Sequence, residues 1–294
     1  MSRILLSLAA FVLSLTSAQA SVVINETNFP DENLRNCASE YDEDGNGTLS
    51  DAELATITSI NAGGILNLKG AEHFKNLEEL LLWGYSEEES IREIDPSMFP
   101  KLYRFSLGEC NGVTVLDFSR NTMFETIELS RCSNVQALSL PTSVKEIQLF
   151  GAPKLTALDV SRLPNLIGLW LQHTGITDLD FSNHPAIQLV SIQGGEDALD
   201  QMNSLNLQNC ATLENVDIRY TTIKSLSMKH LPIVRTLMML NNDITTITID
   251  DCEEFNDITC DHNVLGTLSL TNNPQLRAVN CEDNRLQVLI ADNC

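Results

Sequence analysis

The sequence predicts a β-rich solenoid with a small α-helical cap on its N-terminal side. Three observations lead to this prediction. Apolar residues recur with a period of about 21 residues over most of the chain. Helical periodicity is scarce beyond the first part, and a twelve-residue acidic loop separates two short helical segments there. Stacked repeats of this length bury a shared core that one repeat could not bury alone.

The first twenty residues have the pattern of a signal peptide. Arg3 precedes an apolar run over residues 4–15, and the small residues at 18–20 fit a cleavage site. The run is shorter than the roughly 20 apolar residues that a membrane-spanning helix needs. We therefore expect cleavage after Ala20, a mature chain of residues 21–294 that is secreted or periplasmic, and no membrane insertion.

Residues 21–64 are predicted to form an EF-hand-like cap. One helix is expected from Pro30 to Tyr41 and a short second one from about Ser50 to Ile57. Between them lies the pattern of an EF-hand loop, with Gly47 at the sharp sixth position. The expected ligands of one Ca²⁺ ion are Asp42, Asp44, Asn46, Thr48, Ser50 and Glu53. EF-hands usually occur in pairs and only one is present, so a loop that keeps its shape without binding metal is the alternative.

Residues 65–294 are predicted to form the solenoid, with about ten to eleven coils. The last complete unit, Leu276-x-x-Val279-x-Cys281-x-x-Asn284-x-Leu286, fits the leucine-rich-repeat strand pattern L-x-x-L-x-L-x-x-N-x-L. Units begin at Leu77, Leu102, Phe124, Val144, Leu166, Ile187, Leu213, Val234, Phe255 and Leu276. Each unit has a second alternating half, which predicts parallel strands on the concave face and extended or short β segments on the convex face. Longer spacings predict insertions around residues 86–90 and 194–203.

Asparagine or cysteine at the ninth position of a unit is expected to turn inward. An asparagine there can bond backbone groups where the strand ends, which would otherwise be buried without partners. The repeat register also explains seven of the eight cysteines as buried core residues, with Cys37 on the first helix as the eighth. We expect mostly free thiols. The alternative is one or two disulfides between neighbouring coils, where parallel strands bring Cα atoms close enough.

The motifs resemble those of secreted bacterial leucine-rich-repeat proteins from host-associated species. The resemblance rests on Asn28–Asp31, the acidic loop at 42–50 and the segment 68–77, and on repeat halves such as 155–165 and 276–284. The architecture is also similar to that of internalins, which join an EF-hand-like cap to repeats of about 22 residues and bind host surface proteins. The resemblance implies the fold and export, and it implies no agreed molecular function.

The third, fifth and seventh positions of each unit face outward on the concave side. Exposed aromatic side chains with polar neighbours are typical of binding interfaces. The residues expected to bind a ligand are Phe150, Trp170, Gln172, Gln193, Arg219, Met238 and Leu240. This predicts an exported adhesion or ligand-binding protein that recognises an extracellular protein or glycan. The alternatives are that these residues only cover a strand surface, and that the chain is a structural or scaffold protein of the cell envelope.

Composition and motifs argue against other functions. The net charge of −22 disfavours nucleic acid as a partner. No nucleophile elbow, H-E-x-x-H motif or phosphate loop occurs in the sequence, so we expect no enzyme. The sequence stops midway through an eleventh coil without a covering helix, which predicts end-to-end self-association through residues 286–294.

Overall fold

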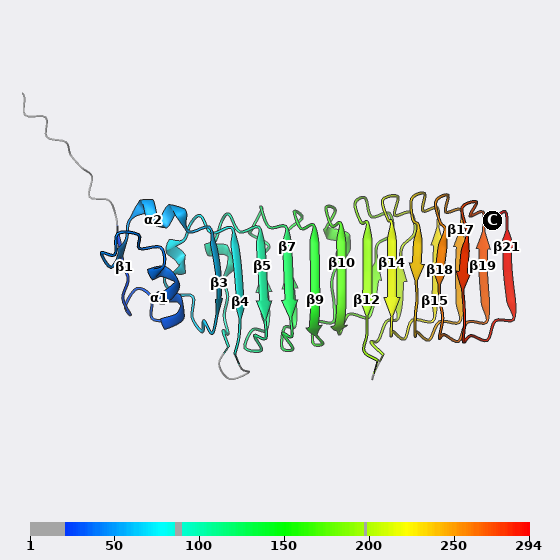
Figure 1. Ribbon diagram of the computed structural model, residues 1–294, viewed down its shortest axis with the longest axis horizontal. Helices are drawn as coiled ribbons and strands as arrows, with labels where there is room; N and C mark the ends of the chain where they lie inside the picture. Colours follow the sequence, from blue (N-terminus) through cyan, green and yellow to red (C-terminus); the bar gives the residue numbers. More distant parts are fainter. Residues whose placement is uncertain (1–20, 86–89, 197–198) are drawn as a thin grey trace, which may run out of the picture.

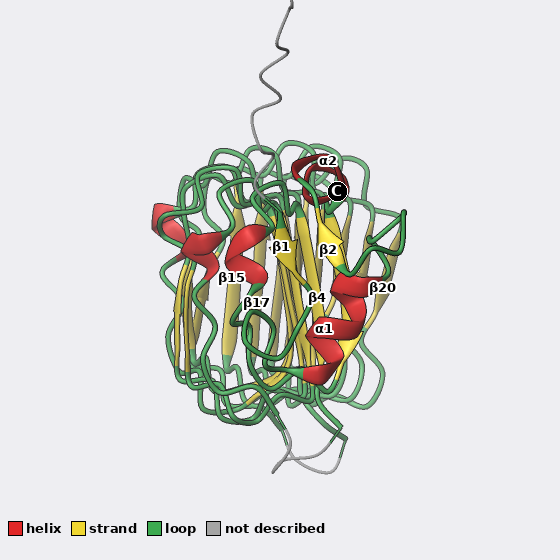
Figure 2. Ribbon diagram, turned by 90° about the vertical axis from the view of Figure 1, so that its left-hand side faces the viewer, coloured by secondary structure: helices red, strands yellow, loops and turns green. Residues whose placement is uncertain are grey.

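A computed structural model describes residues 21–85, 90–196 and 199–294. The expected signal peptide, and residues 86–89 and 197–198 of the two expected insertions, lie outside the described residues. The described chain is a rod of stacked coils with the helical cap at one end (Figure 1). Figure 2 looks along the rod and shows strands on two opposite sides with the cap helices in front. The predicted β-rich solenoid of about 21-residue coils is confirmed.

One continuous parallel sheet of eleven strands forms the concave face. Its order along the rod is β3 (Ser59–Gly63), β4 (Glu79–Trp83), β5 (Arg104–Gly108), β7 (Thr126–Ser130), β9 (Glu146–Ala152), β10 (Gly168–Thr174), β12 (Leu189–Gln193), β14 (Asn215–Arg219), β16 (Thr236–Met238), β18 (Asp257–Thr259) and β20 (Ala278–Asn280). Strand β3 lies before residue 65, where the repeats were expected to begin. Its unit carries Ala62 and Ile65 at the sixth and ninth positions, so it lacks the Asn or Cys of the later units.

The convex face carries three separate parallel sheets. They pair β6 (Val115–Asp117) with β8 (Ala137–Ser139), β11 (Asp178–Asp180) with β13 (Ser204–Asn206), and β15 (Ser225–Lys229), β17 (Thr246–Asp250), β19 (Thr267–Thr271) and β21 (Val288–Asp292) in turn. Short 3₁₀ helices occur at Ala71–His73, Pro96–Met98 and Val160–Arg162. Extended segments on both faces repeat at similar spacings, and the rod axis is accordingly almost straight in Figure 1.

The cap contains α1 (Glu32–Ser39), α2 (Asp51–Thr56) and an antiparallel pair of two-residue strands, β1 (Val22–Val23) and β2 (Thr48–Leu49). Asp31 joins it to the first coil. One carboxylate oxygen of Asp31 accepts the Leu34 amide and caps α1, and the other accepts the Leu66 amide at 2.7 Å. Phe29 of the cap stacks on Phe74 of the first coil, with ring centroids 5.9 Å apart. The cap therefore covers the end of the core both through polar bonds and through aromatic packing.

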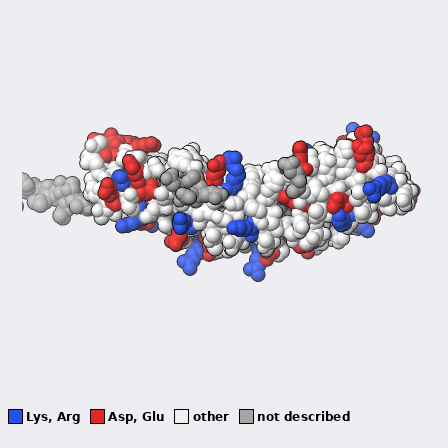
Figure 3. Space-filling view, turned by 90° about the horizontal axis from the view of Figure 1, so that it is seen from below, with Lys and Arg blue, Asp and Glu red and all other residues white. Residues whose placement is uncertain are grey.

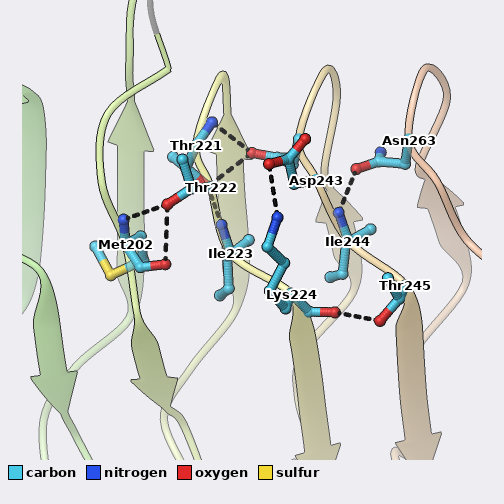
Figure 4. Close-up of polar contacts among 10 residues, drawn as sticks. Met202, Thr221, Thr222, Ile223, Lys224, Asp243, Ile244, Thr245 and Asn263 are labelled. Carbon is cyan, nitrogen blue, oxygen red and sulfur yellow. Dashed lines mark hydrogen bonds and ion pairs between the residues drawn. The ribbon is translucent and has the colours of Figure 1, made fainter.

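Where asparagine occupies the ninth position, at Asn242, Asn263 and Asn284, it bonds its coil to the coil before it, as predicted. Asn242 Oδ1 accepts from the amide and hydroxyl of Thr221, and its Nδ2 donates to the Ile218 carbonyl. Asn263 repeats the pattern: it accepts from the Ile244 amide (Figure 4) and donates to the Met239 carbonyl. Asn242 and Asn263 are buried. They satisfy backbone groups that leave the sheet ladder at the turn and have no water to bond.

The residue before the ninth position adopts a left-handed backbone conformation in most coils. On the concave side these residues are Gly64, Glu109, Arg131, Gly151, His173, Tyr220, Asn241, His262 and Asp283. The corresponding residues on the convex side are Asn183, Asn209, His230, Asp251, Asn272 and Asn293. This conformation turns the chain sharply at the end of a strand and directs the next side chain inward. Seven of these fifteen are Asn or Asp, which tolerate it better than other non-glycine residues.

The eight cysteines are free thiols in the structure, as the first interpretation expected. Burial raises the pKa of Cys110 and Cys260 to about 12 and that of Cys210 and Cys252 to about 11. These thiols are therefore protonated at neutral pH and behave as small apolar core groups. The expectation of seven buried cysteines needs correction. Cys281 is half-buried and Cys294 is exposed, because both lie in the last described coil, whose outer side packs against no described residue.

We predict that Asn242→Ala destabilises the fold by about 2 kcal/mol or more, because it leaves buried groups of Thr221 and Ile218 without partners. Urea unfolding followed by circular dichroism measures this change. The matched control is Asn280→Ala on the exposed face of β20, which should change stability by less than about 0.5 kcal/mol. Equal effects of the two substitutions would contradict the proposed role of the ninth position.

Candidate functional site

The acidic loop of the cap brings three carboxylates together. Ligand atoms of Asp42, Asp44 and Glu53 all lie within 4.8 Å of one another. Asp42 and Asp44 precede the turn at Gly45 and Gly47, both of which have positive φ. Acidic side chains gather at this end of the rod in the view from below (Figure 3). The loop thus folds back far enough for its first, third and twelfth positions to meet.

Hydrogen bonds hold these carboxylates in place. Glu53 accepts from the amide of Glu43 at 2.9 Å and from the amide and hydroxyl of Ser50, both at 2.8 Å. Asp42 accepts from the amides of Asn46 and Gly47. Two hydrogen bonds from Ser50 lower the pKa of the Glu53 carboxyl, and the bond from the Ser50 amide has a larger effect than the bond from its hydroxyl. Glu53 is therefore ionised at neutral pH although its side chain is buried.

The remaining expected ligands are placed differently. The Asn46 side-chain oxygen accepts from the amide and hydroxyl of Thr48, while the Asn46 amide group donates to Asp44. The Ser50 hydroxyl caps α2 and bonds Glu53 in a capping box. Asn46 and Ser50 thus border the carboxylate cluster but direct their oxygens into the loop's own bonds.

The strand β1 pairs with the loop strand β2. Val22 lies opposite Leu49 and Val23 opposite Thr48, in antiparallel register. Leu49 is fully buried under this pair. In a pair of EF-hands, the second loop supplies the strand that pairs with the first loop. The sequence analysis identified no such strand for the single loop of this chain. The only sequence signal for β1 is a run of three apolar residues at 22–24.

The donor set of the loop fits Ca²⁺. All the candidate ligand atoms are oxygens, which hard divalent cations prefer. Oxygens bound to one Ca²⁺ ion at about 2.4 Å can be up to about 4.8 Å apart, so the three carboxylates are close enough together to share one ion. Among the described residues, the hydrogen-bond donors to these carboxylates are amides and a hydroxyl, so no side-chain cation offsets their charge.

The second candidate site is a groove of about 400 Å³ on the concave face. It crosses strands β10, β12, β14 and β16, and three of the predicted ligand-binding residues line it: Trp170, Gln193 and Met238. The indole of Trp170 lies over Gly168 of the same strand, where any side chain would collide with it. The ring therefore lies along the sheet and forms one wall of the groove.

An ion pair forms another part of this groove. Arg219 donates to both carboxylate oxygens of Asp217, at 2.7 and 2.9 Å, and also contacts the sulfur of Met238. Two parallel bonds of this kind fix the geometry of both side chains. Asp217 lines the groove and Arg219 supports it from the next outward position. The groove therefore combines an aromatic wall, an ordered carboxylate and a thioether.

The other predicted residues lie on the same face but outside this groove. Phe150 is in register with Gln172 on the neighbouring strand, and both are half-buried. Leu240 follows the end of β16. Sequence reasoning missed Leu189, Asn215 and Thr236, which line the groove from the third position. The repeat register already places the third position outward, so the sequence contained the information needed to predict that these three residues face the ligand side.

The histidines do not share one site. His184 is buried, and its Nε2 lies 3.0 Å from the Leu163 carbonyl oxygen. His173, His230 and His262 each contact an aspartate on a neighbouring coil: Asp200, Asp251 and Asp283 respectively. These contacts lie at the left-handed ends of strands and are accounted for by coil-to-coil packing. They give no indication of a catalytic arrangement within the described residues.

The sequence matches no family model and no curated protein. Similar solved structures include three from Listeria monocytogenes. The functional domain of InlJ, which includes a cysteine ladder, is 15% identical with a TM-score of 0.47 and covers 91% of this chain and 72% of that one. The internalin inlF is 14% identical with a TM-score of 0.47, covering 93% and 98%. Internalin C2 is 20% identical with a TM-score of 0.49, covering 78% and 91%.

Identities this low and TM-scores below 0.5 transfer no function to this chain. The internalin-like leucine-rich-repeat architecture follows from the chain's own coils: a helical cap, a continuous parallel sheet and inward residues repeated about every 21 positions. Within the described ranges, no helix is both long and apolar enough to cross a membrane.

Proposed function

We propose that this chain is an exported adhesion or ligand-binding protein whose concave groove binds an extracellular protein or glycan. The observation that carries the proposal is the groove lined by Trp170, Gln193, Asp217 and Met238. Its volume of about 400 Å³ falls within the range of about 300–1,000 Å³ typical of ligand sites. A rigid parallel sheet supplies the walls, so a ligand would meet groups that are already in place.

The chemistry of the groove supports a specific ligand. The half-buried indole offers a large apolar surface at small entropic cost, which is why tryptophan often dominates binding interfaces. The Asp217–Arg219 pair orders a carboxylate for a hydrogen-bond donor on the ligand. A scaffold role in the cell envelope is the second candidate, and the regular coil-to-coil bonds of the rod favour it because they make a stiff spacer.

We predict that Trp170→Ala weakens binding of a concave-face ligand by at least about tenfold, because it removes an apolar wall of the groove. The measurement is surface plasmon resonance of residues 21–294 against panels of purified extracellular proteins and glycans. The control is Met123→Ala, whose side chain is 56% exposed outside the groove. A ligand that binds both variants equally would exclude this groove. Failure of every panel member, together with retention in isolated cell envelopes, would favour the scaffold.

We also propose that the cap loop binds one Ca²⁺ ion through Asp42, Asp44 and Glu53. Asn46, Thr48 and Ser50 would complete the shell, with Asn46 and Ser50 exchanging bonds within the loop for the ion. The clustered carboxylates and their neutral hydrogen-bond donors support this assignment. Binding of a cation would relieve the repulsion between three negative charges. It would also lock the cap, because α1 and α2 flank the loop and α1 contacts the first coil through Asp31.

We predict that Ca²⁺ raises the melting temperature of residues 21–294 and that Glu53→Gln abolishes this increase. Isothermal titration calorimetry should show one site in the wild type. Because its hydrogen bonds lower the pKa of Glu53, binding should persist as the pH falls to the ordinary carboxyl pKa of about 4.3 and be lost only below it. No heat and no stabilisation at millimolar Ca²⁺ would refute the proposal. Glu93→Gln, an exposed glutamate outside the loop, is the control.

A third proposal concerns self-association through residues 286–294. Val288, Leu289 and Ile290 of β21 are 45%, 57% and 39% exposed, and β21 pairs on one side only, with β19. An exposed apolar edge strand is a template for pairing with a second chain. We expect light scattering at high micromolar concentration to report species above the monomer mass, and Leu289→Lys to reduce them. A strictly monomeric mass would contradict this proposal.

A further inference from the structure

Two aromatic side chains are exposed at the cap end of the long sheet, away from the groove. Trp83 at the end of β4 is 41% exposed, and Tyr85 just beyond it is 66% exposed. Large exposed aromatic groups are costly in water and mark interaction sites when they occur together. Neither residue takes part in the concave groove or in the calcium loop.

Glycines of the preceding coil support both rings. A Cβ atom added at Gly63 would collide with the indole of Trp83, and one added at Gly64 would collide with the ring of Tyr85. Gly63 lies opposite Trp83 in the sheet register. The indole therefore rests directly on the backbone of β3, which holds it in one orientation rather than leaving it free in solvent.

Gly108 lies on the other side of Trp83 and leaves an open space. It pairs with Trp83 in register, in the interior of a sheet where glycine is otherwise unfavourable. A Cβ atom at Gly108 would lie 3.6 Å from the Trp83 Cβ, which is ordinary contact, and Gly108 is not among the residues with positive φ. Neither packing nor backbone conformation therefore requires glycine here. Such a glycine often marks a place where a ligand approaches the sheet.

The resulting cavity has a volume of about 420 Å³ and a polar rim. Its lining includes Trp83, Tyr85, Gly108, Ser130 and the ion pair between Glu109 and Arg131. The arginine and glutamate side chains are 75% and 48% exposed, so both remain available to a ligand. The pair offers donors and acceptors with no net charge. An apolar wall surrounded by neutral hydrogen-bonding capacity matches a sugar ring, which has an apolar face and hydroxyl groups at its edge.

We propose that this cavity, the Trp83 cavity, binds the pyranose ring of a neutral glycan. The sugar's apolar face would stack on Trp83 and Tyr85 in the space left by Gly108, and its hydroxyl groups would bond Glu109, Ser130 and Arg131. An anionic sugar is disfavoured by the chain's net charge of −22. A prolyl or aromatic peptide side chain would cover the exposed ion pair without offering it a hydrogen bond. The cavity is four strand steps from Trp170, roughly 19 Å, and the inference does not rest on the proposed function of that groove.

The chain has two tryptophans, so one substitution isolates the signal. In the Trp170→Phe variant of residues 21–294, Trp83 is the only tryptophan, so tryptophan fluorescence reports on this cavity alone. The probes are neutral oligosaccharides of glucose, mannose, galactose or N-acetylglucosamine, with a proline-rich peptide as the contrasting ligand. We expect a saturable change in Trp83 emission with at least one saccharide and none with the peptide.

Two further variants test the site itself. Gly108→Leu should fill the cavity, and Tyr85→Ala should remove one wall. Each should lower the saccharide affinity by at least about tenfold. Ser106→Leu places the same side chain two residues away on the same strand and should leave the affinity unchanged. Tyr85 is exposed, so its variant tests the site even if Gly108→Leu unfolds.

Three results would overturn the proposal: no emission change with any saccharide, equal saccharide affinity in the parent and Tyr85→Ala proteins, or a response to the peptide alone. Loss of ligand binding in Trp170→Ala concerns only the concave groove, so the outcomes for the two sites are distinguishable.

Discussion

Backbone groups at the strand ends impose the constraint on which this rod depends. Each time the chain leaves a strand it turns over an apolar core, and the amides and carbonyls there lose their ladder partners. A residue with a left-handed backbone makes the turn, and the inward side chain that follows bonds the neighbouring coil, as Asn242 does with Thr221 and Ile218. Since an unsatisfied buried group costs about 1–3 kcal/mol, the short inward asparagine and the left-handed residue before it are parts of one solution. Asn242 and Asn263 provide this solution on the concave side, and Asn284 repeats it in the last described unit.

Much of the fold could be predicted because its determinants recur along the sequence. Inward apolar positions, ninth-position asparagines and buried thiols such as Cys260 are each seen several times, and repetition separates them from chance. The acidic loop of the cap was equally visible, because a local pattern of twelve residues fixes its shape. The first coil was missed because its unit carries Ala62 and Ile65 where later units carry the diagnostic residues. The boundary of the cap therefore could not be read from the repeat.

The features of the concave face that could not be predicted from the sequence are those set by contacts between coils. The outward positions were known, but the repeat register does not predict that the Trp170 indole packs over Gly168 or that Arg219 forms an ion pair with Asp217. The pairing of β1 with the loop strand was hidden for a similar reason, since three apolar residues are too few to identify a strand or its partner. Flat sheets leave the direction of each outward side chain to its neighbours, and a glycine beside an aromatic residue decides that direction. Pairs of this kind are the local signal to look for in other repeat proteins.

The bonds that join the coils also determine how the rod would respond to a pulling force. The cap and the last strand lie at opposite ends of the long axis (Figure 1), and the ladder bonds run along that axis from coil to coil. A load applied across the two ends would therefore break the bonds between one pair of coils at a time, rather than all the coil-to-coil bonds at once. Each coil that yields releases about 21 residues, which can extend to roughly 70 Å, in place of a rise of about 4.8 Å. A rod of this design is stiff while its coils are stacked. Once the load exceeds what one coil-to-coil contact can hold, it would lengthen coil by coil and absorb mechanical work, while the coils still stacked would keep their outward faces intact.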